Sequence, residues 1–151
     1  MINELEKKFK QMQSSVKSEF EKFEKLKHAN VSSDSWDRPE GGGGVTCVIA
    51  DGDFFDNCAI NFSSIFGKNL PEAALARSLK KEVDFGYRAM GVSVISHPAN
   101  PHVPTSHMNV RLFGILDKNN EIHDWWIGGG YDLTPFIPYE EDIVNWHKSA
   151  K

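Results

Sequence analysis

The sequence has 151 residues, of which 40% are hydrophobic and 25% are charged, as is typical of a soluble globular domain with one sizeable core. Its formal net charge of -4 and its pI of about 5.8 exclude a global attraction to nucleic acid. No apolar run reaches the ~20 residues that a membrane-spanning helix needs, and the N-terminus lacks the apolar core of a secretory signal. We therefore expect a cytoplasmic protein with no transmembrane segment and no nucleic-acid partner.

The N-terminal segment carries apolar residues at helical spacing. They recur every three or four positions and are Ile2, Leu5, Phe9, Met12, Val16, Phe20, Phe23 and Leu26. This spacing predicts an amphipathic helix over residues 1–27 with one apolar face. The aromatic residues on that face favour packing on a sheet, and a coiled coil is the alternative.

The middle of the sequence is rich in β-forming residues. A polar, turn-forming stretch at 30–40 leads into the glycine run 41–44, and two β-rich runs follow at 45–50 and 54–62. An Asp51-Gly52 turn between these runs predicts a hairpin. Cys47 and Cys58 lie in the two strands without a CxxC spacing, so we expect buried free thiols and no disulfide or structural zinc site.

The remaining elements complete an alternating order. A short helix begins at Pro71, strands are predicted at 91–96, 108–116 and 121–127, and a last helix at 139–148 has acidic residues in its first turn. The order helix, hairpin, helix, hairpin, helix favours an α+β fold, with an antiparallel sheet flanked by helices on both faces. Since no repeat or linker divides the sequence, we expect a single domain over residues 1–151.

The densest group of chemically active side chains lies between His97 and Arg111. Three prolines restrict φ in this loop and stiffen it. In the strand that follows, alternation places His107, Asn109 and Arg111 on one face and Val110 on the other. An imidazole, an amide and a guanidinium in a row can bind an anionic ligand, but they can equally form the solvated face of an edge strand.

A second group surrounds the glycine run 128–130. Asp132 follows these glycines and lies close in sequence to Trp125 and Trp126. An aspartate after glycine is typical of a turn or a helix cap. In a partly desolvated aromatic pocket, the same carboxylate can act as a general base or accept a hydrogen bond from a pyrrole N–H.

Metal, nucleotide and acyl-transfer chemistry have weaker support. His97, His107 and His147 with Asp132 could supply metal ligands, but their spacing matches no local zinc signature. Neither glycine run has a dinucleotide or Walker pattern, so the glycines are better explained by close approach of the backbone to a flat ligand or to a neighbouring strand. No G-x-S-x-G elbow is present.

Several blocks, in order, resemble the oxygen-dependent coproporphyrinogen III oxidases. The blocks are Gly41 to Gly44, Gly91-Val92-Ser93, His97 to Arg111, Trp125 to Pro135 and Glu140-Glu141-Asp142, within roughly residues 36–147. The resemblance implies a large antiparallel sheet between helices, a homodimer, and oxidative decarboxylation of coproporphyrinogen III to protoporphyrinogen IX by O2 in haem biosynthesis. Family members are considerably longer, so the resemblance also implies an N-terminal half, truncated at its C-terminus. A catalytically inactive fragment that binds porphyrinogen or a protein partner is the alternative.

The same resemblance suggests roles for individual residues. It assigns His107 to a proposed proton donor and Asp132 to an aspartate that holds the pyrrole nitrogens. It assigns substrate contacts to Ser93, Asn109, Val110 and Arg111. It implies no required cofactor and O2 as co-substrate, although some bacterial members are described with manganese at histidines that match His97, His107 and His147.

Overall fold

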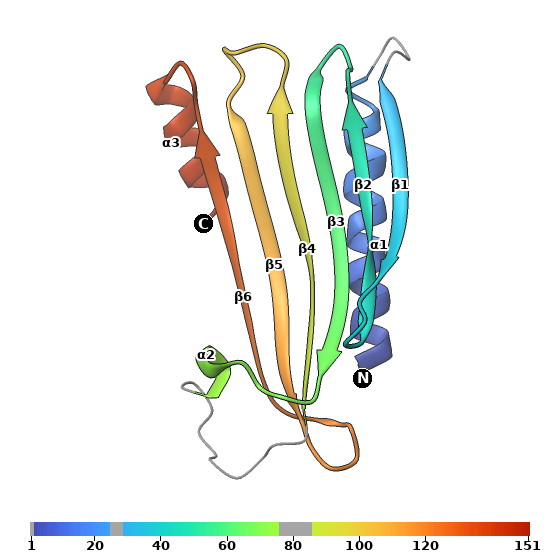
Figure 1. The fold of residues 1–151 in the computed structure, drawn as a ribbon. Coiled ribbons are helices and arrows are strands. Elements are labelled where there is room, and N and C mark those ends of the chain that lie inside the picture. Colours follow the sequence, from blue (N-terminus) through green and yellow to red (C-terminus); the bar gives the residue numbers. More distant parts are fainter. Residues whose placement is uncertain (1, 25–28, 76–85) are drawn as a thin grey trace.

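The computed structural model describes residues 2–24, 29–75 and 86–151, and its centre is one antiparallel sheet of six strands (Figure 1). The strands are β1 (Asn30–Asp37), β2 (Gly42–Ala50), β3 (Phe55–Gly67), β4 (Tyr87–Pro98), β5 (Thr105–Leu116) and β6 (Ile122–Thr134). They lie side by side in sequence order, because antiparallel neighbours need only short connections. The predicted α+β class and the antiparallel sheet are confirmed.

Three helices accompany the sheet: α1 (Ile2–Glu21), α2 (Glu72–Leu75) and α3 (Glu140–Ser149). The predicted first helix ends earlier than expected, and its predicted apolar position Leu26 lies outside the described residues. Helix α2 begins where the helix after Pro71 was predicted, and the rest of that prediction also lies outside the described residues. No helix in the described ranges is long and apolar enough to cross a membrane.

Both longer helices lie on the same face of the sheet. Helix α1 packs against β3 and β4, and its Phe9 is buried in a cluster that includes Ile60. In α3, the Trp146 ring stacks on Tyr131 of β6 at a centroid distance of 4.0 Å. Tyr131 pairs with Met108, which packs against the same cluster. The prediction of helices on both faces is therefore not met in the part of the chain that the structure describes.

The two faces differ in chemistry because side chains alternate along each strand. The face under α1, called here the helix face, carries Cys47, Ile49, Cys58, Ile60, Phe62, Met90, Val92, Val94 and Leu112. The opposite face, called here the polar face, carries Asn61, Ser93, His107, Asn109, Arg111 and Asp132. Full burial of a side chain as large as isoleucine contributes about 1.5–3 kcal/mol, so the helix face holds the fold together. The two cysteines are free and buried, as predicted.

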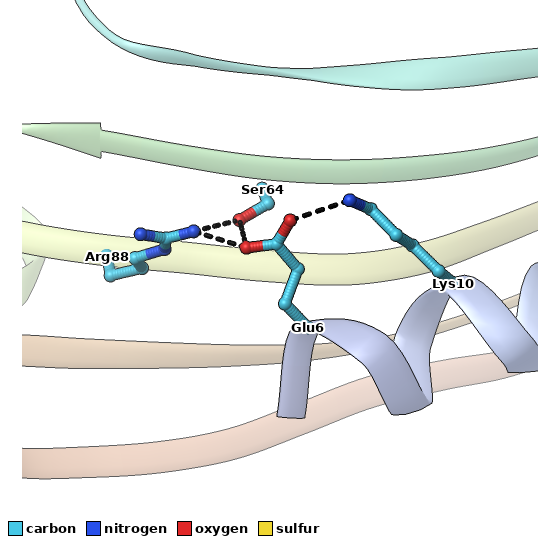
Figure 2. A network of polar contacts seen from close by, with 4 residues as sticks. All are labelled: Glu6, Lys10, Ser64 and Arg88. Carbon is cyan, nitrogen blue, oxygen red and sulfur yellow. Dashed lines mark hydrogen bonds and ion pairs between the residues drawn. The ribbon is translucent and has the colours of Figure 1, made fainter. Parts of the chain in front are cut away.

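Two polar residues of α1 specify how the helix sits on the sheet. Gln13 is only 5% exposed, and its Nε2 donates to the carbonyl oxygens of Val45 at 2.8 Å and Ile60 at 2.9 Å. Glu6 accepts hydrogen bonds from Arg88 and Ser64 and pairs with Lys10 Nζ at 2.8 Å, as Figure 2 shows. A buried polar group without partners costs about 1–3 kcal/mol, so these pairings disfavour other placements of α1.

Two sequence predictions about the strands are wrong. The polar stretch 30–40, predicted as turn-forming, contains β1, which is an edge strand exposed along its whole length. The strand predicted at 121–127 was expected to end before the glycines 128–130, but these glycines lie inside β6 and pair with β5. In both segments, backbone hydrogen bonds to the neighbouring strand provide the pairing, and such bonds leave no hydrophobic pattern in the sequence.

Candidate active site

A groove of about 400 Å³ lies on the polar face, over β3, β4 and β5. The polar side chains that line it are those of Asn61, Ser63, Ser93, His107, Asn109 and Arg111. Cross-strand pairing explains why they meet: Asn61 pairs with Ser93, and Ser93 pairs with Asn109. The sheet register thus gathers polar residues from three separate segments of the sequence.

His107 and Asp132 occupy paired positions on β5 and β6. His107 Nδ1 lies 2.9 Å from Asp132 Oδ2. A carboxylate can only accept, so His107 donates from Nδ1, and Nε2 carries the lone pair when the ring is neutral. That Nε2 lies 3.4 Å from Ser93 Oγ. A hydroxyl, an imidazole and a carboxylate therefore follow one another across three strands.

A serine, a histidine and an aspartate in this order also occur in hydrolases, where the serine is a nucleophile. Acyl transfer additionally needs N–H donors that stabilise an oxyanion. Ser93 lies in the interior strand β4, whose backbone pairs with β3 on one side and β5 on the other. Backbone donors around Ser93 are consequently engaged in the sheet. The geometry supports proton exchange rather than a nucleophilic serine.

Arg111 lies two residues beyond Asn109 on the same face. Asn109 Oδ1 accepts from Arg111 Nε at 3.3 Å and from Nη2 at 3.1 Å, which orients the guanidinium. The Nη1 donors remain directed away from that contact and can bind a carboxylate. Val110 points the other way: its side chain packs against the core of the helix face, and only its backbone can border the groove.

Glycines make the polar face flat beside Arg111. Gly44, Gly91 and Gly128 occupy the same cross-strand row as this arginine. A Cβ at Gly91 would lie 2.5 Å from the Val110 carbonyl oxygen, so the sheet itself requires glycine there. A Cβ at Gly128 would meet nothing within 4 Å. The space above Gly128 is free for a bulky, flat ligand.

Aromatic rings close the groove at one end. Phe113 stacks on Tyr87 at a centroid distance of 5.2 Å and on Trp126 at 4.7 Å. Phe113 lies two residues beyond Arg111 and lines the groove. A ligand in the groove therefore meets an apolar wall beside the cationic group, which is the usual composition of a small-molecule site.

Comparison with known protein families identifies the family to which this chain belongs. The family model for coproporphyrinogen III oxidase matches residues 4–151. The chain belongs to the coproporphyrinogen III oxidase family. The resemblance drawn from the sequence blocks is thereby confirmed. Membership in this family links the chain to porphyrin biosynthesis and to oxidoreductase chemistry.

The manganese described for some coproporphyrinogen oxidases does not fit the arrangement of the histidines. Alternation along β4 puts His97 on the polar face, where its Nδ1 lies 3.4 Å from Thr105 Oγ1. His147 belongs to α3, which packs on the helix face. Across residues 2–24, 29–75 and 86–151, no three His, Cys, Asp or Glu side chains gather as metal ligands would.

Sequence reasoning missed two residues of this groove, Asn61 and Ser63. They alternate with Ile60 and Phe62 along β3, and that alternation is the signal that would have placed them on a polar face. It could not have placed them beside Ser93, because the partner strand and its register are not visible in the sequence.

Proposed function

We propose that this chain catalyses the oxygen-dependent oxidative decarboxylation of coproporphyrinogen III to protoporphyrinogen IX. The observation that carries the proposal is the His107–Asp132 pair on the same face of the sheet as Arg111, a face that glycines keep flat. The family match gives the reaction class, and the groove supplies an anion-binding group and a proton-exchanging group within it.

The reaction converts propionate side chains into vinyl groups. For each propionate, the carboxylate carbon leaves as CO2, a hydrogen leaves the carbon next to the pyrrole ring, and two electrons are removed. Two decarboxylations release four electrons, which together with protons reduce one O2 to two water molecules. Dioxygen is thus the co-substrate, and we propose that no organic cofactor is required.

In this proposal, Arg111 holds a propionate through the guanidinium N–H groups that do not bond Asn109. Asp132 uses Oδ2 for His107, so Oδ1 is available to accept from a pyrrole N–H. His107 Nε2 then exchanges a proton near the reacting side chain, and Ser93 orients that nitrogen from 3.4 Å. A homodimer in the cytoplasm belongs to the same proposal and is supported by the family resemblance alone.

Porphyrinogen binding without catalysis is the second candidate, and one observation favours it. The Asp132 side chain is 60% exposed, so water reaches the site. Oxidative chemistry on an electron-rich ligand is better controlled where water is excluded. Under this alternative the groove would bind porphyrinogen but would not consume O2.

The test is turnover of coproporphyrinogen III in air, measured as fluorescent protoporphyrin after oxidation of the product. Spontaneous oxidation is subtracted with a protein-free sample, and a chelator-treated sample tests for a metal. The His107→Ala variant should lose activity. His123→Ala should retain it, because this variant removes an exposed histidine at the opposite end of β6 from Asp132. Tight porphyrin binding without oxygen consumption would instead establish the second candidate.

A further inference from the structure

Strand β3 contributes polar side chains to the groove from a segment with no role in the proposed chemistry. Asn61 and Ser63 line the groove together with the residues of β4 and β5. Asn61 forms one cross-strand row with Ser93 and Asn109, and the row continues to Thr46 on β2. The polar surface therefore extends well beyond the His107–Asp132 pair.

The Asn61 amide is placed to serve a ligand. In the same row, Ser93 is already paired with His107, and Asn109 with Arg111. Asn61 is partly buried. Among the described residues, its side-chain amide forms no hydrogen bond with another side chain. An amide offers two N–H donors, and a partly buried donor gains most from a charged acceptor.

The distance to Arg111 indicates what kind of ligand could use both groups. Neighbouring strands lie about 4.8 Å apart, so β3 and β5 are about 10 Å apart across the sheet. One carboxylate cannot bridge that span. Between Ser63 and Arg111 the row contains only Gly91, so no side chain stands in the way of a macrocycle. A macrocyclic ligand with acidic groups on different edges fits both positions.

We propose that Asn61, assisted by Ser63, binds a second carboxylate of the substrate, so that the groove selects porphyrinogens by the spacing of two acidic side chains. This inference rests on the proposed function, since it takes the propionate at Arg111 as given. Asn61 and Ser63 are neutral and donate hydrogen bonds, so they orient the ring rather than attract it from a distance. Their role is to decide which substituent lies near His107.

The experiment compares two fluorescent porphyrins that do not react. Coproporphyrin III carries four carboxylates, and a synthetic porphyrin with a single propionate can satisfy Arg111 but not Asn61 as well. Both are titrated into the full 151-residue chain and its variants, with circular dichroism to verify folding. The variants are Asn61→Ala, Ser63→Ala and Arg111→Ala, and the matched control is Asn57→Ala, an asparagine on the same strand and face but outside the groove.

The wild-type chain should prefer coproporphyrin III, and Asn61→Ala should reduce that preference about ten-fold, as expected for loss of a hydrogen bond to a charged group. Ser63→Ala should reduce it less, Asn57→Ala should leave it unchanged, and Arg111→Ala should weaken binding of both porphyrins. If Asn61→Ala does not fold, Asn61→Asp has the same size and should repel the carboxylate.

An unchanged preference in Asn61→Ala and Asn61→Asp overturns the inference. If Arg111→Ala still weakens both porphyrins in that case, the proposed function stands without it. If the wild-type chain binds neither porphyrin, the substrate site itself is wrong and the inference fails with it.

Discussion

His107 on β5 and Asp132 on β6 are cross-strand partners whose Nδ1 and Oδ2 atoms lie 2.9 Å apart, although the two residues are 25 positions apart in the sequence. The register of two neighbouring strands creates this contact, and no loop is needed to hold it. The carboxylate keeps the proton on Nδ1 and leaves Nε2 facing Ser93. Rigid strands therefore preorganise the candidate proton-exchange group.

Replacing Asp132 by asparagine should test that arrangement. In Asp132→Asn the amide can donate to Nδ1, which favours a proton on Nε2 and thus the wrong tautomer. We expect kcat for coproporphyrinogen III to fall by about 100-fold or more, with a smaller change in KM. Asp124→Asn, at the opposite end of β6 from Asp132, is the control, because within the described ranges that carboxylate accepts only from the neighbouring Trp125 N–H. Equal kcat values for Asp132→Asn and wild type would contradict the assignment.

The same added methyl group should affect stability at one glycine of the polar face and ligand binding at another. Gly91→Ala places Cβ 2.5 Å from the Val110 carbonyl oxygen and should destabilise the fold by about 1–3 kcal/mol in urea denaturation. In Gly128→Ala the added Cβ has no atom within 4 Å, so the free energy of unfolding should change by less than about 0.5 kcal/mol. Gly128→Ala should nevertheless weaken coproporphyrin binding, because the methyl group occupies the space beside Arg111. Unimpaired binding by Gly128→Ala would argue that the ring lies elsewhere.

The Glu6 network predicts a pH-dependent contribution to stability. The hydrogen bond from Lys10, with the charges of Lys10 and Arg88, holds the pKa of Glu6 below its ordinary 4.5, although burial opposes the shift. A carboxyl whose pKa is lower in the folded state stabilises the fold above its unfolded pKa, and this contribution disappears as the pH falls through the folded pKa. Glu6→Gln should therefore cost about 1–2 kcal/mol at pH 7 and progressively less below pH 4.5.

The measurement for Glu6 is urea denaturation of wild type and Glu6→Gln over a pH series. Glu4→Gln is the matched control on the same helix, since its exposed pair with Lys8 is 3.9 Å long and should contribute at most about 0.5 kcal/mol. A difference between wild type and Glu6→Gln that stays constant from neutral to acidic pH would show that the ionised carboxylate is not the stabilising group.

The buried thiol of Cys58 should be unreactive in the folded chain. Burial raises its pKa to about 12, and its side chain is fully enclosed on the helix face. Because the thiolate is the reactive form, a disulfide reagent at pH 8 should modify Cys58 only through unfolding. The reagent should titrate both thiols at once in denaturant. Rapid native modification of Cys58, located by mass spectrometry, would indicate that the strands under α1 open readily.

Some elements could be predicted because their signals are local. The three-and-four spacing of apolar residues predicted α1, and the acidic first turn predicted α3 at nearly its observed bounds. Strand β1 could not be predicted in this way: its serines and aspartates have low β-propensity, and it exists because β2 offers a free edge with which to pair. The glycines of β6 are a second such case.

The sequence by itself determined the family, the class of fold, and the face of β5 on which His107, Asn109 and Arg111 lie, because alternation along a strand is a local property of the chain. Only the tertiary structure decided that Asp132 reaches His107, that Asn61 joins the same groove, and that α1 and α3 share one face. The physical reason is that register and layer order depend on how distant segments pair and bury one another, and a single segment carries no record of its partner.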